Sequence, residues 1–354
     1  MAAELGIPQC RKYRVAQRQE VLGRFGVPTT LLEWREVAAL RRALPEHDAL
    51  MLYRVPASAS VLSLISEARS LGLVTCFEID DLVCQPDLYL ANTNLHDLSS
   101  DEVRMMMIEA TRMSATARHC DRGIGSTPGI ASQLSGLCGS ASVISNALDC
   151  ETLALAARPR MRSLDGRVRI FYGTGTRTHD RDFAIVSEAL SAVLDIRNHV
   201  EIWLVGPVRA GHGLEGHPRV KHLGLRSFPD YMELLAGADI SIAPLEGTAF
   251  NDAKSNIKFL EASALGIPSV CSPRAEYRAA IRHGVTGYLA ETTQDWVGSL
   301  LALVDSTEQR VTVGRLALSS AREHYDLDVI MRTQVADFLG SLAAMPRISV
   351  EYRR

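Results

Sequence analysis

The chain has 354 residues, which is long for a single hydrophobic core and suits two domains of ordinary size. Charged residues make up 22% and the formal net charge is -3, so the chain lacks the strongly basic character of a nucleic-acid-binding protein. No apolar run approaches the roughly 20 residues that cross a bilayer. The seven cysteines form no CxxC pair. We therefore expect a reduced, cytoplasmic protein, at most peripheral to the inner face of a membrane, with no nucleic-acid partner.

Short apolar runs alternate with amphipathic stretches along most of the chain, which predicts βα units and parallel sheets. In the first half, the predicted strands are 29–34, 49–55, 73–80, 122–127 and 142–145. In the second half, they are 168–174, 200–206, 219–224, 239–245 and 268–272. The pattern predicts two α/β Rossmann-like domains over 1–150 and 151–330. A C-terminal helix or tail over 331–354 is left over, and its return to the first domain is open.

The start of the chain lacks an expected element. A Rossmann-like domain begins with a strand in the middle of its sheet, yet residues 1–10, "MAAELGIPQC", hold no apolar run of strand length. Residues 11–26 predict the first helix, which Gly26 and Pro28 end. We therefore expect the N-terminal domain to lack its first strand, as in a fragment or a reading frame assigned too short a start. Amide exchange should then be faster over 29–80 than over 168–272.

The stretch "NDAKSNIKFLEASALGIPSV" predicts a helix over about 252–265, capped by Asn251 or Asp252 and ended by Gly266 and Pro268. The amides at the start of such a helix attract anions.

Lys254 and Ser255 fall in the first turn of this predicted helix, where they could hold a diphosphate. Glu261 returns to the same face two turns later, about 10 Å along the axis, at a suitable distance to accept hydrogen bonds from ribose hydroxyls. In the alternative interpretation, Lys258 and Glu261 form a surface ion pair and Lys254 is solvated.

A second polar cluster follows the predicted strand 168–174. The turn Gly173-Thr174-Gly175 admits a close backbone approach, and His179 and Asp180 follow a few residues later. The turn is not a GxGxxG dinucleotide fingerprint, because position 178 is threonine. A tight βα turn with an ordinary capping aspartate remains the alternative.

In the first half, "CFEIDDLVCQP" ends a predicted strand with Asp80 and Asp81, and carboxylates at such an edge commonly face a cleft. They could bind a divalent cation that bridges a diphosphate. Alternatively, Asp81 caps the next helix.

Several runs in order resemble one family. They are "FYGTGTRTHDRDFAIVSEAL", "VEIWLVGP", "HLGLRSFPDYMELLAGADISIAPL", "NDAKSNIKFLEASALGIPSVCS" and "EYRAAIRHGVTGYLAETTQDW". Together they resemble the donor-binding domain of the retaining family-four (group 1) glycosyltransferases, and "FEIDDLV" and "VISNALD" extend the resemblance into the first half. It covers about 49–296 and implies the GT-B fold, in which two Rossmann-like domains face each other across a cleft.

The resemblance implies transfer of a sugar from a nucleoside-diphosphate sugar to a hydroxyl of a glycan or lipid-linked acceptor, with retention, in polysaccharide or cell-envelope biosynthesis. The lysines of the predicted helix over 252–265 supply charge for a diphosphate, so we expect no metal, and no cofactor beyond the nucleotide sugar as co-substrate. Asp80 and Asp81 would orient the acceptor, and Lys258 would stabilise the leaving diphosphate. The implied donor contacts are Gly173, Thr174, Gly175, His179, Asp180, Arg226, Pro244, Lys254, Ser255, Lys258 and Glu261.

One position departs from the family. The family's E-x7-E pattern places a glutamate where this chain has Ala253, so only Glu261 of the pair is present. The first glutamate contacts the donor sugar in the family, and its loss leaves the sugar and part of the catalytic geometry open. This loss leaves a non-catalytic nucleotide-sugar-binding subunit as an alternative. An NAD(P)- or nucleotide-sugar-binding oxidoreductase or epimerase is the other alternative, which the missing third glycine and the lack of a Tyr-x-x-x-Lys pair disfavour.

Overall fold

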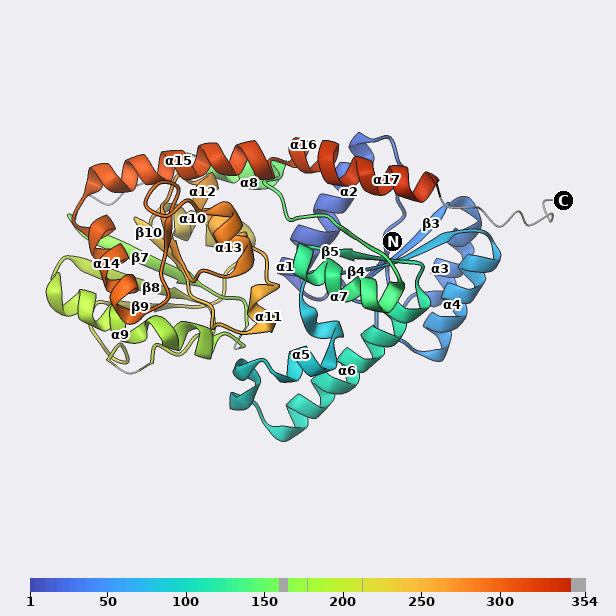
Figure 1. The fold of residues 1–354 in the computed structure, drawn as a ribbon, viewed down its shortest axis with the longest axis horizontal. Coiled ribbons are helices and arrows are strands. Elements are labelled where there is room, and N and C mark those ends of the chain that lie inside the picture. The colour runs from blue at the N-terminus through green and yellow to red at the C-terminus, as the bar shows by residue number, and fades with distance from the viewer. Residues whose placement is uncertain (159–164, 177, 212, 345–354) are drawn as a thin grey trace.

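The protein forms two lobes, each built around a six-stranded sheet, in a computed structural model that describes residues 1–158, 165–176, 178–211 and 213–344 (Figure 1). All strand pairs in both sheets are parallel, as the alternation of apolar runs and helical stretches predicts. The last ten residues of the predicted C-terminal tail, 345–354, lie outside the described residues.

The N-terminal sheet has the order β2-β1-β3-β4-β5-β6. Its strands are β1 (Ala2–Ala3), β2 (Leu32–Glu33), β3 (Ala49–Tyr53), β4 (Val74–Ile79), β5 (Arg122–Gly125) and β6 (Ala141–Val143). The helical segments of this lobe are α1 (Pro8–Cys10), η1 (Arg11–Ala16), α2 (Gln17–Arg24), α3 (Val37–Ala43), η2 (Leu44–Glu46), α4 (Ala59–Ser70), η3 (Leu82–Cys84), α5 (Pro86–Leu90), η4 (Thr93–Asp97), α6 (Ser100–His119) and α7 (Pro128–Cys138).

The expectation of a missing first strand is wrong. Ala2 and Ala3 form β1, which pairs with β2 on one side and with β3 on the other. Both alanines are fully buried. A strand of two small residues gives no apolar run in the sequence, yet it supplies the ladder partners that its two neighbours need. The reason for expecting a looser N-terminal half therefore no longer holds.

The C-terminal sheet has the order β12-β11-β10-β7-β8-β9. Its strands are β7 (Val168–Gly173), β8 (Val200–Val205), β9 (Val220–Leu223), β10 (Ile240–Ala243), β11 (Ser269–Cys271) and β12 (Tyr288–Leu289). Every residue of β7 is buried, because helices cover both faces of the sheet. The helices of this lobe are α8 (Cys150–Ala156), α9 (Asp180–Ile196), α10 (Phe228–Ala236), α11 (Ala249–Asp252), α12 (Ile257–Ala264), α13 (Ala275–Ala280), α14 (Thr293–Val304) and α15 (Thr307–Tyr325).

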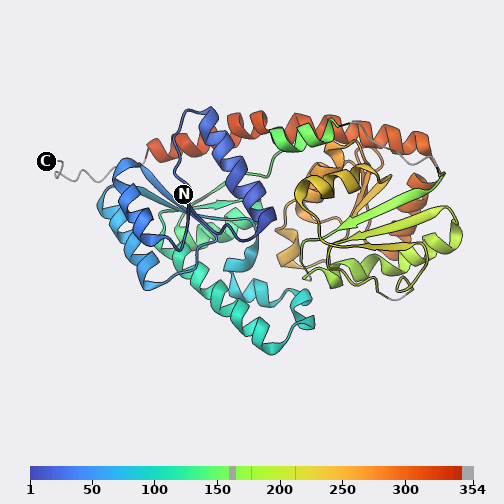
Figure 2. The same ribbon diagram turned by 180° about the vertical axis from the view of Figure 1, so that it is seen from behind.

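The C-terminal helices run along both lobes. Figures 1 and 2 show α15 against the C-terminal lobe, followed by segments that lie on the N-terminal one. These segments are α16 (Leu327–Ile330), η5 (Met331–Val335) and α17 (Ala336–Ala343). Buried Leu327, Ile330 and Phe338 pack in one cluster with Ile124 of the N-terminal sheet. The end of the described chain therefore belongs to the core of the first lobe.

The two places where the chain passes between the lobes lie side by side. The amide of Leu148, on the first passage, donates to the carbonyl of Tyr325 at 2.7 Å. The amide of Leu327, on the second passage, donates back to the carbonyl of Leu148 at 3.2 Å. A parallel bridge between Leu148 and Asp326 thus joins the two connections.

Candidate functional site

The candidate site lies where α11 of the C-terminal lobe meets the N-terminal lobe (Figure 1). Phe250 and Ala253 are buried within the hydrophobic core of the N-terminal lobe. The Phe250 ring stacks on Tyr89, with centroids 5.5 Å apart. The Thr127 hydroxyl donates to the carbonyl of Ala253 at 2.7 Å. The edges of the two lobes are therefore in direct contact at this point.

The helix predicted over 252–265 is two helices. α11 ends at Asp252 and α12 begins at Ile257, so Lys254 and Ser255 lie in the turn between them. The Thr248 side chain caps α11. The Asn251 amide is used elsewhere, because it donates to Asp182 at 2.7 Å and to the Glu246 carbonyl at 3.1 Å. Tertiary hydrogen bonds thus override the capping role that the sequence favours.

Asp182 is the centre of this site, and the sequence analysis missed it. The side chain is fully buried on the first turn of α9, where it accepts from Asn251, from the amide of Glu246 at 3.0 Å and from Asn94 at 3.2 Å. Lys254 Nζ lies 3.5 Å from its second oxygen. Asn94 comes from the N-terminal lobe, so both lobes hold this carboxylate.

His179 Nδ1 also faces Asp182, at 3.1 Å. Burial, followed by the Lys254 charge, lowers the pKa of His179 to about 4. Burial would raise the pKa of Asp182, but the His179 hydrogen bond and Lys254 bring it well below its usual value. His179 is therefore neutral at pH 7, which supports a contact role and not proton transfer.

These two groups make stability depend on pH in the same direction. The unfolded chain protonates His179 near pH 6.5, whereas the folded chain resists protonation down to about pH 4. The contribution of His179 to the free energy of unfolding is therefore fully present above pH 6.5. It is lost as the pH falls towards 4, with a slope of up to about 1.4 kcal/mol per pH unit. We expect His179→Gln to flatten this slope in urea unfolding series. An unchanged slope would show that other groups cause it.

Glu261 and Lys258 lie one turn apart on α12. Glu261 is 7% exposed and accepts from the hydroxyl of Tyr13 at 2.5 Å and from that of Tyr231 at 3.0 Å. Burial raises the pKa of Glu261, against both tyrosine hydrogen bonds and Lys258. Burial and then Lys254 lower the pKa of Lys258. No ion pair joins Lys258 to the described residues, so its ammonium group is ready for an anionic ligand.

The glycine-rich turn begins at the end of β7. A side chain at Gly173 would come 2.5 Å from the Tyr231 ring, so this position has to be glycine. The Thr174 amide donates to Val205 at 2.9 Å, and Gly175 is half-buried. Asp180 accepts from the amide of Arg209 at 3.0 Å. The turn therefore packs tightly beside Tyr231, and Asp180 fixes the neighbouring loop.

Three further predicted donor contacts have different surroundings. Pro244 is buried directly after β10, at the same sheet edge as Gly173. Arg226 is exposed in the loop between β9 and α10. Ser255 accepts from the Asn146 side chain at 3.0 Å and so bridges to the chain that connects the lobes.

The two acidic residues of the N-terminal lobe have different surroundings. Asp80 accepts from the Arg54 guanidinium at 2.7 Å and from the Tyr53 hydroxyl at 2.9 Å. Asp81 accepts from the amide of Leu82 at 3.0 Å, which caps the short helix η3. Burial would raise the pKa of Asp80, but Arg54 lowers it below its usual value. Burial raises the pKa of Asp81, opposed by Lys254 of the other lobe.

Arg54 has an unusual backbone. With a φ of 52°, it is the one non-glycine residue with positive φ in the described part of the chain. Such a conformation costs of order 1–3 kcal/mol. It sits directly after β3 and aims the side chain at Asp80. No sequence signal marks this position, because arginine does not favour a positive φ.

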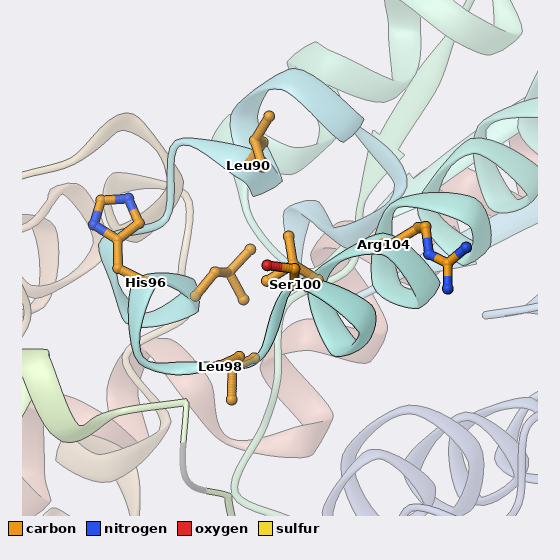
Figure 3. A pocket seen from close by; sticks show the side chains of 7 residues that line it. Leu90, His96, Leu98, Ser100 and Arg104 are labelled. Atoms are coloured by element: carbon orange, nitrogen blue, oxygen red, sulfur yellow. The ribbon is translucent and has the colours of Figure 1, made fainter.

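A separate cavity of about 480 Å³ lies on the α5–α6 projection of the N-terminal lobe (Figure 3). None of its lining residues is a predicted site residue: Leu90, Leu95, His96, Leu98, Ser100, Val103 and Arg104. We place the site at the junction of the lobes, because the buried charged groups gather there. Within the described ranges, no group of three or more His, Cys, Asp and Glu side chains is arranged to hold a metal ion.

Comparison with known proteins shows what part of the chain, and which fold, resemble glycosyltransferases. Residues 167–306 match the family model described as glycosyl transferases group 1. The whole fold is similar to Anabaena HepE, solved in complex with UDP and glucose, with a TM-score of 0.60, 17% identity and coverage of 91% of this chain and 89% of that one. A glycosyltransferase from Rickettsia africae gives a TM-score of 0.58, 10% identity and coverage of 92% and 88%. Sucrose-phosphate synthase from Thermosynechococcus elongatus gives 0.55, 12% identity and coverage of 90% and 82%.

The chain therefore has the GT-B fold, and this part of the resemblance is confirmed. The match to the group 1 glycosyltransferase model lies within the C-terminal lobe. No curated protein matches the chain in sequence. Among the described residues, no helix has both the length and the apolar character to span a membrane.

Proposed function

We propose that the protein is a glycosyltransferase that transfers a sugar from a nucleoside-diphosphate sugar to a hydroxyl of a glycan or lipid-linked acceptor. The observation that carries this proposal is the row Lys254, Ser255, Lys258 and Glu261, which is partly or fully buried beside the glycine-rich turn. This row lies within the segment that matches the group 1 family. The UDP bound in HepE supports a nucleotide as the ligand of such a domain.

On the donor side, the mechanism rests on stabilising the negative charge of the leaving group. Departure of a nucleoside diphosphate leaves negative charge on phosphate oxygens, and preorganised cations in a dry site stabilise it. Lys258 supplies that charge and Lys254 supports it, while Glu261 accepts hydrogen bonds from the ribose. Lys254 exchanges part of its interaction with Asp182 for the phosphate.

On the acceptor half, we assign Asp81 and Asp80 different roles. Opposite pKa shifts in neighbouring carboxyl groups indicate different functions. Asp80 is held by Arg54 and Tyr53 and keeps the strand edge in place. Asp81 follows the end of β4, at the sheet edge that faces the other lobe, and we assign it the orientation of the acceptor hydroxyl. Retention of configuration, a role in polysaccharide or cell-envelope synthesis and peripheral membrane association belong to the same proposal, on the resemblance alone.

Metal independence is a prediction of this mechanism. Because Lys254 and Lys258 can neutralise the diphosphate, activity with the donor should survive an excess of EDTA. Turnover before and after chelation measures this. Complete loss, restored by magnesium or manganese, would instead favour Asp80 and Asp81 as metal ligands.

The most informative experiment is a thermal-shift panel of UDP-, GDP-, ADP- and dTDP-sugars, with NAD(P) as the test of an oxidoreductase. A ligand at 100 times its dissociation constant stabilises the fold by about 2.7 kcal/mol. No stabilisation by any nucleotide sugar would contradict the proposed function.

A non-catalytic binding subunit is the second candidate, because one specific observation favours it. Ala253 replaces a family glutamate and is 4% exposed, against Gly129 and Thr127 of the other lobe. Slow release of free sugar from the stabilising nucleotide sugar would exclude this candidate.

A further inference from the structure

A hydrogen bond between the lobes involves the carboxylate of Glu261, which binds the ribose hydroxyls in the proposed function. The hydroxyl of Tyr13, from η1 of the N-terminal lobe, donates to Glu261 Oε1 at 2.5 Å. The two residues are 248 positions apart, and both are buried, at 8% and 7% exposure. Glu261 therefore has little room for a further partner while Tyr13 is in place.

The second oxygen of Glu261 is also in use. It accepts from the hydroxyl of Tyr231 at 3.0 Å, so both carboxylate oxygens take a hydroxyl donor. A ribose hydroxyl offers the same chemistry as the Tyr13 hydroxyl, because either group can donate to a carboxylate oxygen. Tyr231 belongs to α10, in the same lobe as Glu261, and moves with it. Tyr13 is the partner that comes from the other lobe.

Tyr13 is held at the junction by its neighbours. Lys12 binds Asp149 at 2.7 Å and Glu151 at 2.8 Å, which are the cap and the first turn of α8. The Tyr13 ring meets Phe228 of α10 edge-on, with centroids 6.0 Å apart. These contacts fix η1 against the C-terminal lobe close to the two chain passages.

We propose that the Tyr13 hydroxyl is an internal occupant of the ribose position at Glu261, which a nucleotide must displace. Donor entry then moves η1 away from α12 and couples nucleotide binding to the contact between the lobes. This inference rests on the proposed function, in which Glu261 binds ribose. A ligand that must first break a competing contact binds more weakly than the bare site allows.

The test is calorimetric titration of UDP into the whole protein and its variants. Tyr13→Phe keeps the ring and removes the competing donor, so we expect UDP to bind about tenfold more tightly. Tyr231→Phe is the matched control, because it removes an equivalent hydrogen bond from a residue that stays with Glu261. We expect no gain in affinity for that variant.

Glu261→Gln separates this inference from the proposed function. We expect it to weaken UDP binding about tenfold, the order of a charge-assisted hydrogen bond, and Tyr13→Phe added to it should give no further gain. If Glu261→Gln weakens binding but Tyr13→Phe leaves it unchanged or weaker, the inference alone is overturned. If Glu261→Gln has no effect, the ribose role fails and the inference fails with it.

Hydrogen exchange of the unmodified protein gives a second measurement that needs no variant. UDP should lower amide protection over Arg11–Ala16 (η1), although ligands usually raise protection. Raised or unchanged protection in this segment at saturating UDP would contradict displacement of Tyr13.

Discussion

Lys258→Ala should lower donor turnover by about 10²- to 10³-fold, the loss typical of removing one preorganised group that stabilises developing charge. Burial lowers the pKa of Lys258, and its ammonium group has no ion pair with the described residues. In the free protein, its positive charge is therefore not neutralised by an ion pair with a described residue and can interact with the leaving diphosphate. Lys258 is half-buried and its nearest aromatic partner, the Tyr172 ring, lies 5.9 Å away, so we expect the variant to fold normally.

Steady-state turnover of the nucleotide sugar found in the thermal-shift panel measures this effect. Lys221→Ala is the matched control, because Lys221 is exposed on β9 and lies 3.9 Å from Glu201. Turnover of the control should stay close to that of the unmodified protein. Less than a threefold loss in Lys258→Ala would remove Lys258 from the mechanism.

Asp182→Ala should destabilise the protein by about 3–5 kcal/mol, the usual cost of removing one partner of a buried ionic pair. The carboxylate accepts from three donors and lies 3.5 Å from Lys254. Its removal leaves a buried ammonium group and several unmet donors. Because Asn94 belongs to the other lobe, the variant should also loosen the junction between the lobes.

Urea unfolding followed by circular dichroism measures the change in free energy. Asp180→Ala is a close control on the same helix, because Asp180 is 14% exposed and bonds the amide of Arg209. We expect that control to lose about 1 kcal/mol. If both variants lost the same amount, Asp182 would not be the centre of the site.

The strands were predictable where burial on both faces produces continuous apolar runs. β7 and β8 are such strands, and every strand predicted from an apolar run is present. β1 was not predicted, because two buried alanines form neither an apolar run nor an alternating pattern in the sequence. The difference lies in length, since a ladder of two residues can complete a sheet without leaving a signal in the sequence.

The site was predictable in its residue types but not in its connections. Lys254 and His179 were singled out separately, whereas their shared partner Asp182 was missed. A signal existed, because position 182 falls on the same helical face as buried Val186 and Ala189. The break between α11 and α12 had no local signal, since Asn251 is drawn into hydrogen bonds set by the tertiary structure.

The paired connections at Leu148 and Asp326 limit how the lobes can move. Two separate linkers would permit sliding and twisting, whereas two linkers bonded to each other act as a single pivot with one main axis. Any opening is then a rotation whose displacement grows with distance from that pivot. The Tyr13–Glu261 contact lies near this pivot, because the neighbouring Lys12 binds Asp149. Figure 1 shows α11 farther from α16, so the contact of α11 with the N-terminal lobe has to open further for the same angle. A small change at the carboxylate thus becomes a large displacement at the outer edge of the interface.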